Sequence, residues 1–270
     1  MRRTTARINR FFISTSDFFL EAVGGLRDAL VLLSDLSFFS FQMIFQRRAT
    51  RHGEFIRNTL NYGLGAVPII AVIMFLIGFI SALQSAAQLR LVGANLFVAD
   101  LLAIGMTAEM GPLMAAIIVT GRSGSSIASE IATMKYTEEL DALKTMGLNP
   151  VKFVMVPKLW AMIISMPILT MFSSAMGILG GTTIAVTYLN LSFDSFWGEI
   201  THALAFRDIL SGTVKSVCYA MLITVIGCYQ GLSFTGSADG VGRATTKSVV
   251  TSIFWIIAAD SVLGLLFYFK

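Results

Sequence analysis

The chain has 270 residues, yet it contains only two cysteines and two histidines. Cys218 and Cys228 lie in one apolar segment, too far apart along a helix to form a disulfide, so both are expected to be ordinary core residues. His52 and His202 are isolated from each other and from acids at metal-ligand spacing. The sequence therefore predicts no metal site.

Motifs for nucleotide binding and hydrolysis are also missing. The sequence has no GxxxxGK[ST] phosphate loop, no GxSxG elbow and no HExxH pair. The glycine-rich segment 236–243 follows no strand and is interpreted as a flexible turn. We therefore expect a protein that is not an enzyme, and that binds no ATP or other cofactor through a motif of its own.

What the chain does contain is apolar residues, which make up 55% of it, against 13% charged residues. A helical span needs about 20 mostly apolar residues. Five segments meet that length, at roughly 64–84, 96–120, 159–188, 209–232 and 248–269. The segment 11–45 is interrupted by charges, which favours an interfacial amphipathic helix over a cleaved signal peptide. The fold class is thus all-α integral membrane, with an N-terminal region 1–62 and a five-span domain 63–270.

Lys and Arg are distributed unevenly between the two sides of these spans. Nine precede the first span, five lie within 121–158, and two lie within 233–247. The positive-inside rule places these three regions in the cytoplasm and the C-terminus outside. The basic excess is therefore a topological signal, and no nucleic-acid binding is expected.

The segment 129–146 is too polar to lie in lipid. Its apolar residues recur at helical spacing among charged ones, which predicts one amphipathic helix. Gly147 and Asn149-Pro150 then predict its end. Preceded by a small-residue hinge at 121–126, this helix is either a solvated surface helix without a partner or a docking surface that transmits motion from a cytoplasmic motor.

Three acids interrupt the apolar spans, and each is costly there. Asp100 lies near the outer end of its span, where facing water explains it. Glu109 lies deeper, beside a helix kink expected at Pro112. It either lines a polar cavity or contacts a lipid headgroup, or it forms a structural hydrogen bond. Asp260 is expected to be structural, pairing with Lys215 or with a hydroxyl on another span.

The chain resembles the MlaE (YrbE-type) permeases over about residues 54–268. The resemblance is carried by Glu109-Met110-Gly111-Pro112, Gly121-Arg122-Ser123-Gly124, Ala128-Ser129-Glu130-Ile131, Thr137-Glu138-Glu139, Asn149-Pro150 and Gly242-Arg243-Ala244-Thr245-Thr246-Lys247. One position departs from the family, because Ala108 stands where these permeases usually have an arginine before the glutamate.

The resemblance implies the permease subunit of an ABC transporter in the bacterial inner membrane. It would form a homodimer and move phospholipid or a related lipid to a periplasmic Mce-domain partner. A separate cytoplasmic ABC ATPase would hydrolyse ATP, with a small cytoplasmic accessory subunit as a further possible partner. The alternative is an ion-coupled carrier or intramembrane enzyme that uses Glu109 and Asp260.

The resemblance, together with the positions of the residues along the spans, predicts roles for particular residues. Coupling to the ATPase is expected of Glu130, Met134, Lys135, Glu138, Glu139, Asp141 and Leu143. The lipid pathway is expected to include Glu109 together with Leu76, Phe79, Ile80, Leu83 and Gln84 on span one. Pro112 and Asp260 are expected to be structural residues within the membrane.

Overall fold

A computed structural model describes residues 27, 30–42, 52–236 and 238–268, and these residues are almost entirely helical. Five of the described helical segments are long and apolar enough to cross a membrane: Gly53–Leu89, Phe97–Tyr136, Val151–Thr187, Phe206–Leu232 and Asp239–Phe267. The predicted all-α integral membrane fold with five spans is confirmed.

The first three spans are assembled from consecutive helical pieces, whereas the fourth and fifth are the single helices α10 and α11. The bounds of all these elements are α2 His52–Gly63, η1 Leu64–Ala66, α3 Val67–Leu89, η2 Arg90–Val92, α4 Phe97–Gly105, η3 Met106–Met110, α5 Gly111–Val119, η4 Thr120–Gly124, α6 Ser125–Tyr136, α7 Glu139–Thr145, η5 Val151–Met155, α8 Val156–Thr187, α9 Phe193–Ala203, α10 Phe206–Leu232 and α11 Ala238–Tyr268. Of these, η1 and η2 are 3₁₀ turns, and η3, η4 and η5 are π-helical.

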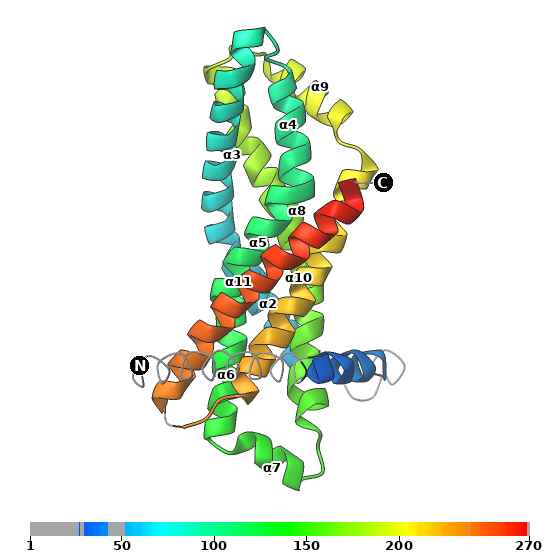
Figure 1. The fold of residues 1–270 in the computed structure, drawn as a ribbon, viewed down its shortest axis with the longest axis vertical. Coiled ribbons are helices and arrows are strands. Elements are labelled where there is room, and N and C mark those ends of the chain that lie inside the picture. Colours follow the sequence, from blue (N-terminus) through cyan, green and yellow to red (C-terminus); the bar gives the residue numbers. More distant parts are fainter. Residues whose placement is uncertain (1–26, 28–29, 43–51, 237, 269–270) are drawn as a thin grey trace, which may run out of the picture.

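The bundle has two distinct ends, and α8 runs through its middle. Helix α8 packs against α3, α10, α2 and α5, while α11 crosses obliquely in front of α5 and α10 (Figure 1). Helix α7 and the loop between α10 and α11 lie at one end, called here the α7 end, and α9 lies at the other. The segments 121–158 and 233–247, which are rich in Lys and Arg, therefore meet at the same end of the molecule.

Two helices continue past the boundaries expected from hydropathy. Helix α2 runs through η1 into α3, so the expected boundary at 62/63 falls inside one long helical segment. The segment 121–126, expected to be a hinge, does not interrupt the helix. It is helical, because η4 passes directly into α6 and the second span extends to Tyr136.

Glycine allows the first and third spans to pack backbone against backbone. A Cβ added at Gly78 of α3 would collide with the carbonyl of Gly177 on α8, and one at Gly180 would collide with the carbonyl of Phe75. Small residues permit this close approach in lipid, where dispersion forces and hydrogen bonds hold helices together. The two spans thus form a tightly packed pair.

Pro112 is accommodated by a π-helical turn immediately before it. It lies in the first turn of α5, after the π turn η3, whose Met106 carbonyl accepts from the amide of Gly111. Two hydroxyls of α8 also bond to carbonyls here: Ser174 donates to Met106 at 3.0 Å, and Ser173 donates to Gly111 at 2.9 Å. Such local bonds are how a membrane helix tolerates proline.

The N-terminal interfacial region is described only in part. Leu30–Gln42 is an apolar helix too short to span a membrane, and it lies across the α7 end, roughly perpendicular to the spans (Figure 1). The rest of the expected interfacial segment 11–45, apart from residue 27, lies outside the described residues.

Candidate functional site

The predicted single helix over 129–146 is wrong, because the structure divides it in two. Helix α6 ends at Tyr136, Glu138 adopts a left-handed backbone conformation with φ of 61°, and α7 begins at Glu139. The local sequence Tyr-Thr-Glu-Glu contains no Gly, Asn or Pro to indicate this break. Gly147, with φ of 75°, and Asn149 end α7 where the sequence predicted.

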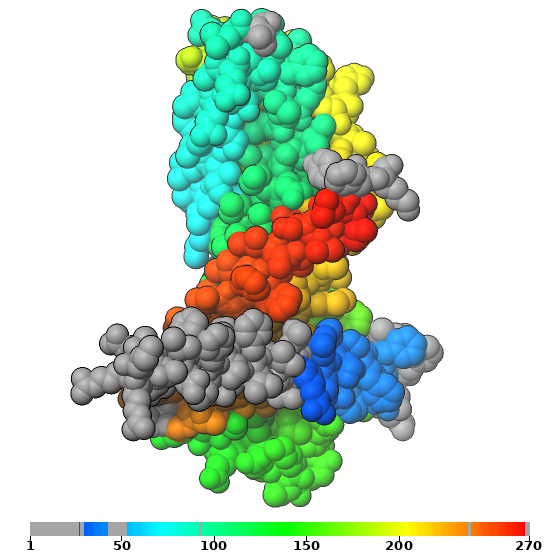
Figure 2. All heavy atoms as spheres, viewed as in Figure 1, coloured from blue at the N-terminus to red at the C-terminus, as the bar shows by residue number. Residues whose placement is uncertain are grey.

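Helix α7 therefore lies as a separate short helix at the tip of the molecule. Its apolar residues Leu140 and Leu143 are buried, while Glu138, Glu139 and Asp141 are exposed. Figure 2 shows α7 and the end of α6 (green) protruding beyond the level of the blue helix. The exposed surface of this tip thus carries several acidic side chains.

One of these acids is held in its ionised form by a neighbour on the same helix. The Lys144 ammonium donates to Asp141 Oδ1 at 2.8 Å. This hydrogen bond holds the pKa of the Asp141 carboxyl below its ordinary value. Asp141 therefore remains charged even in mildly acidic conditions.

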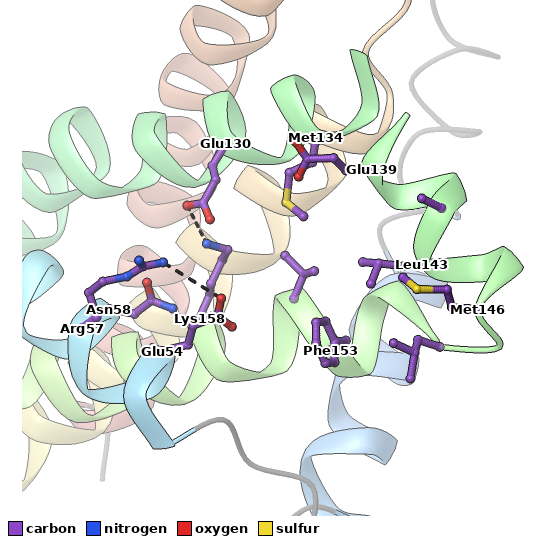
Figure 3. A pocket seen from close by; sticks show the side chains of 13 residues that line it. Glu54, Arg57, Asn58, Glu130, Met134, Glu139, Leu143, Met146, Phe153 and Lys158 are labelled. Carbon is purple, nitrogen blue, oxygen red and sulfur yellow. Dashed lines mark ion pairs between the residues drawn. The ribbon is translucent and has the colours of Figure 1, made fainter. Parts of the chain in front are cut away.

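Behind α7 lies a cavity of about 390 Å³ between α2, α6, α7 and η5–α8 (Figure 3). Met134, Leu143, Met146 and Phe153 line its apolar part. Its other part is charged and is lined by Glu54, Arg57, Glu130 and Lys158. The cavity thus joins an apolar recess behind the α7 tip to a set of ionic contacts between spans.

The shorter of the two ion pairs that line this cavity joins the second and third spans. Glu130 of α6 lies 2.6 Å from the ammonium of Lys158 on α8, and Lys158 is only 2% exposed (Figure 3). Removing one partner of such a pair would leave a buried charge without compensation. This pair therefore links the two helical segments that lead into and out of α7.

A second lysine connects the end of α6 to the end of α10. Lys135 Nζ donates to the carbonyl oxygens of Leu232 at 2.5 Å and Phe234 at 2.7 Å. A lysine at the C-terminus of a helix satisfies carbonyls that have no intrahelical partner. Glu130 and Lys135, both expected to couple to an ATPase, thus make contacts within the chain. Met134 and the buried Leu143 of α7 line the cavity.

A second group of charges lies inside the bundle. Lys215 of α10 is 0% exposed, and its ammonium bonds to the carboxylates of Glu109 on η3 and Asp260 on α11, the latter at 2.9 Å. The Tyr219 hydroxyl donates to the same Asp260 oxygen at 2.5 Å. Asp260 was predicted from the sequence to pair either with Lys215 or with a hydroxyl on another span. The structure shows both, because Asp260 bonds to Lys215 and to the Tyr219 hydroxyl.

This cluster explains how Glu109 is accommodated without a basic neighbour at Ala108. The counter-charge comes from Lys215, more than one hundred residues later in the chain. Lys215 was predicted from the sequence as a partner of Asp260 only, and Tyr219 was not singled out. The available signal was that Lys215 and Tyr219 are one helical turn apart, at the spacing of side chains that share a face.

Asp100, the third intramembrane acid, was expected to face water. Asp100 lies in the first turn of α4, but its Oδ1 is buried and has no hydrogen-bond partner among the described residues. Exposure to water therefore does not explain this oxygen.

The five span-one residues expected on the lipid pathway all lie on α3. Leu76, Ile80, Leu83 and Gln84 are exposed, whereas Phe79 is partly buried. Glu109 instead contacts α10 and α11. In a single chain, the structure therefore leaves most of these α3 side chains on the outer surface.

The helices and the buried charge cluster define an all-α integral membrane protein that crosses the bilayer several times. The sequence profile of a family described as Permease MlaE matches residues 55–266. This match covers most of the chain, and the chain therefore belongs to the MlaE permease family, as its motifs predicted.

Individual proteins from distant organisms are also similar. A probable ABC transporter permease protein of Rickettsia felis is 36% identical over 213 residues, covering 79% of this chain and 82% of that protein. The Haemophilus influenzae intermembrane phospholipid transport system permease protein MlaE is 32% identical over 202 residues, covering 74% and 77%. The chloroplastic protein TRIGALACTOSYLDIACYLGLYCEROL 1 of Arabidopsis thaliana is 30% identical over 216 residues, covering 78% and 62%.

Proposed function

We propose that this chain is the permease subunit of an ABC transporter that moves phospholipid or a related lipid. A separate ATPase supplies the energy, and a periplasmic Mce-domain partner exchanges lipid with the permease. The observation that carries the proposal is the α7 tip, a short acidic helix that protrudes from an otherwise apolar bundle. The name of the Haemophilus relative supports the lipid substrate.

The contacts behind α7 support a role in force transmission. The Glu130–Lys158 pair connects α6 to α8, and Lys135 connects α6 to the end of α10. A push on α7 is thereby passed to three spans through charged and hydrogen-bonded contacts. This arrangement suits a helix that couples ATP hydrolysis in a partner to movement of the spans.

Orientation and assembly follow from the same proposal. The α7 end faces the cytoplasm of a bacterial inner membrane, and the C-terminus faces the periplasm. The meeting of the basic segments at the α7 end supports this orientation. A homodimer would enclose the exposed α3 side chains as a lipid pathway beside Glu109, and a small accessory subunit would bind on the cytoplasmic side.

The test is copurification of the chain with its ATPase after reversing charges on α7. We expect Glu138→Lys with Glu139→Lys to reduce the recovered ATPase roughly tenfold or more, because both acids are exposed at the proposed interface. The matched control is Asp194→Lys with Glu199→Lys, the same charge change on α9 at the other end. Unchanged copurification and lipid transport in the α7 variant would overturn the proposal.

An ion-coupled carrier that uses Glu109 and Asp260 is the alternative function. Both carboxylates bond to Lys215, an arrangement that accounts for them as structural partners. The discriminating measurement is lipid transport in liposomes that contain this chain alone. Transport driven by a pH gradient without the ATPase would favour the alternative.

A further inference from the structure

A second cavity, of about 340 Å³, lies beside the one in Figure 3, between α2 and the η4–α6 segment. The two cavities share Arg57, Asn58 and Glu130, and Figure 3 shows these three side chains near Lys158. Side chains that carry polar groups line the second cavity, at the point where the apolar parts of spans one and two end. Its lining residues Arg57, Asn61 and Arg122 are exposed, so the cavity is accessible from the surface of the molecule.

The mouth of the cavity is cationic. Arg122 and Arg57 are both exposed there, and the Arg122 guanidinium donates to the Asn61 carbonyl at 2.8 Å. The absence of a side chain at Gly65 lets the Arg122 guanidinium lie against the backbone there, because a Cβ at that position would collide with it. One bond to a carbonyl leaves most of the five N–H donors of Arg122 available to a ligand.

The charge of the cavity is positive despite one lining carboxylate. Glu130 lines it, but this carboxylate bonds to Lys158 at 2.6 Å. Arg57 also has Glu54 at 4.0 Å, a distance at the limit of an ion pair. An anion at the mouth would therefore meet two guanidinium groups and a carboxylate that is already compensated.

The floor of the cavity carries two buried hydroxyl groups that have no partner among the described residues. Tyr62 is 4% exposed and Ser123 is 1% exposed, and both line this cavity. Neither hydroxyl oxygen has a hydrogen-bond partner within the described part of the chain. Buried hydroxyls are normally paired, so two unpaired ones beneath two arginines indicate a ligand rich in acceptor oxygens. A phosphate group offers such oxygens and matches the arginine fork.

An apolar strip leads away from this site along the first span. Arg57 and Asn61 are followed at helical spacing by Leu64, Pro68 and Val72, and all five residues are exposed. A ligand with its phosphate in the cavity would therefore lay an apolar tail along Leu64 and Val72. This combination favours a phospholipid over a free phosphate ion.

We propose that Arg122, Arg57, Tyr62 and Ser123 form a binding site for the phosphate of a phospholipid in the leaflet at the α7 end. The acyl chains lie along the exposed strip of α2 and α3. Binding of a phospholipid at this site does not depend on the proposed function. The idea that the bound phospholipid is also transported does rest on the proposed function.

The test measures lipid binding to the purified full chain by native mass spectrometry in mild detergent. The probes are phosphatidylglycerol, a diacylglycerol with the same acyl chains, and inorganic phosphate. We expect phosphatidylglycerol to bind roughly tenfold or more tightly than diacylglycerol, because charge-assisted bonds to phosphate are strong. Inorganic phosphate binding as tightly as the lipid would overturn the assignment to a phospholipid.

Two variants and one control test the named residues. Arg122→Gln and Tyr62→Phe are expected to abolish the preference for phosphatidylglycerol. Arg207→Gln is the control, because Arg207 is also exposed and also donates to a main-chain carbonyl, that of Phe267, at the other end of the bundle. Tyr62→Phe should leave the thermal midpoint unchanged or raised, since it removes a buried unpaired hydroxyl.

The outcomes separate this site from the proposed function. Variants at Arg122 and Tyr62 that bind phosphatidylglycerol like the unaltered chain would overturn the site, whether or not the ATPase copurifies. If the phosphatidylglycerol preference depends on both residues while no ATPase copurifies with the unaltered chain, the site stands and the proposed function fails.

Discussion

Replacing Lys215 by methionine should destabilise the bundle strongly. The Lys215 ammonium is fully buried and bonds to both Glu109 and Asp260, so Lys215→Met leaves two carboxylates without their counter-charge. Breaking a buried ion pair by removing one partner costs about 3–5 kcal/mol. We expect a loss of that size in the free energy of unfolding, measured by denaturant titration in detergent micelles.

Two comparisons make this result interpretable. Lys144→Met removes an equally close ion pair at 2.8 Å, but that pair is exposed, so stability should stay close to that of the unaltered chain. Combining Lys215→Met with Glu109→Gln and Asp260→Asn removes all three charges and should restore most of the loss. If Lys215→Met proves no more harmful than Lys144→Met, the cluster is not desolvated and the reasoning is wrong.

Two further predictions concern packing and pH. Gly78→Ala should destabilise the chain by about 1–3 kcal/mol, because the added methyl meets the Gly177 backbone, whereas Gly121→Ala meets nothing and should be tolerated; thermal unfolding in detergent compares them. The pKa of Asp141 is lowered in the folded state by its hydrogen bond to Lys144. The stabilisation from this pair is therefore fully present above the ordinary aspartate pKa of about 3.9, and it is lost as the pH falls through the lower pKa of the folded state. NMR titration of the Asp141 carboxyl should show this pKa rising towards its ordinary value in Lys144→Met, and an unchanged value would contradict the hydrogen bond.

Much of the architecture was predictable from the chain because the bilayer restricts it. Five apolar runs of sufficient length predicted five spans, and the Lys and Arg distribution predicted which connecting segments share a side. The motif from Glu109 through Asn149-Pro150 predicted the family. Each of these signals is local, or is a sum over local composition, and needs no knowledge of which helices touch.

The errors occurred where helices continue or break without a compositional signal. Residues 121–126 are rich in glycine and serine, yet they remain helical, and Gly124 lets η4 pack closely against Ile223 of α10. Conversely, α6 breaks at Glu138, where no residue type indicates a turn. Packing of Leu140 and Leu143 against the bundle decides the direction of α7.

The sequence by itself determined that this protein lies in a lipid bilayer, how many spans it has and which family it belongs to. It also determined which acidic residues lie within the apolar spans. Only the tertiary structure decided what those acids touch. It brought Lys215 to Glu109 and Asp260 and set Lys158 against Glu130. It also placed Arg122, Tyr62 and Ser123 around one cavity. The physical reason is that hydropathy acts on each segment separately, whereas a buried charge or hydroxyl is satisfied by whichever helix packs beside it.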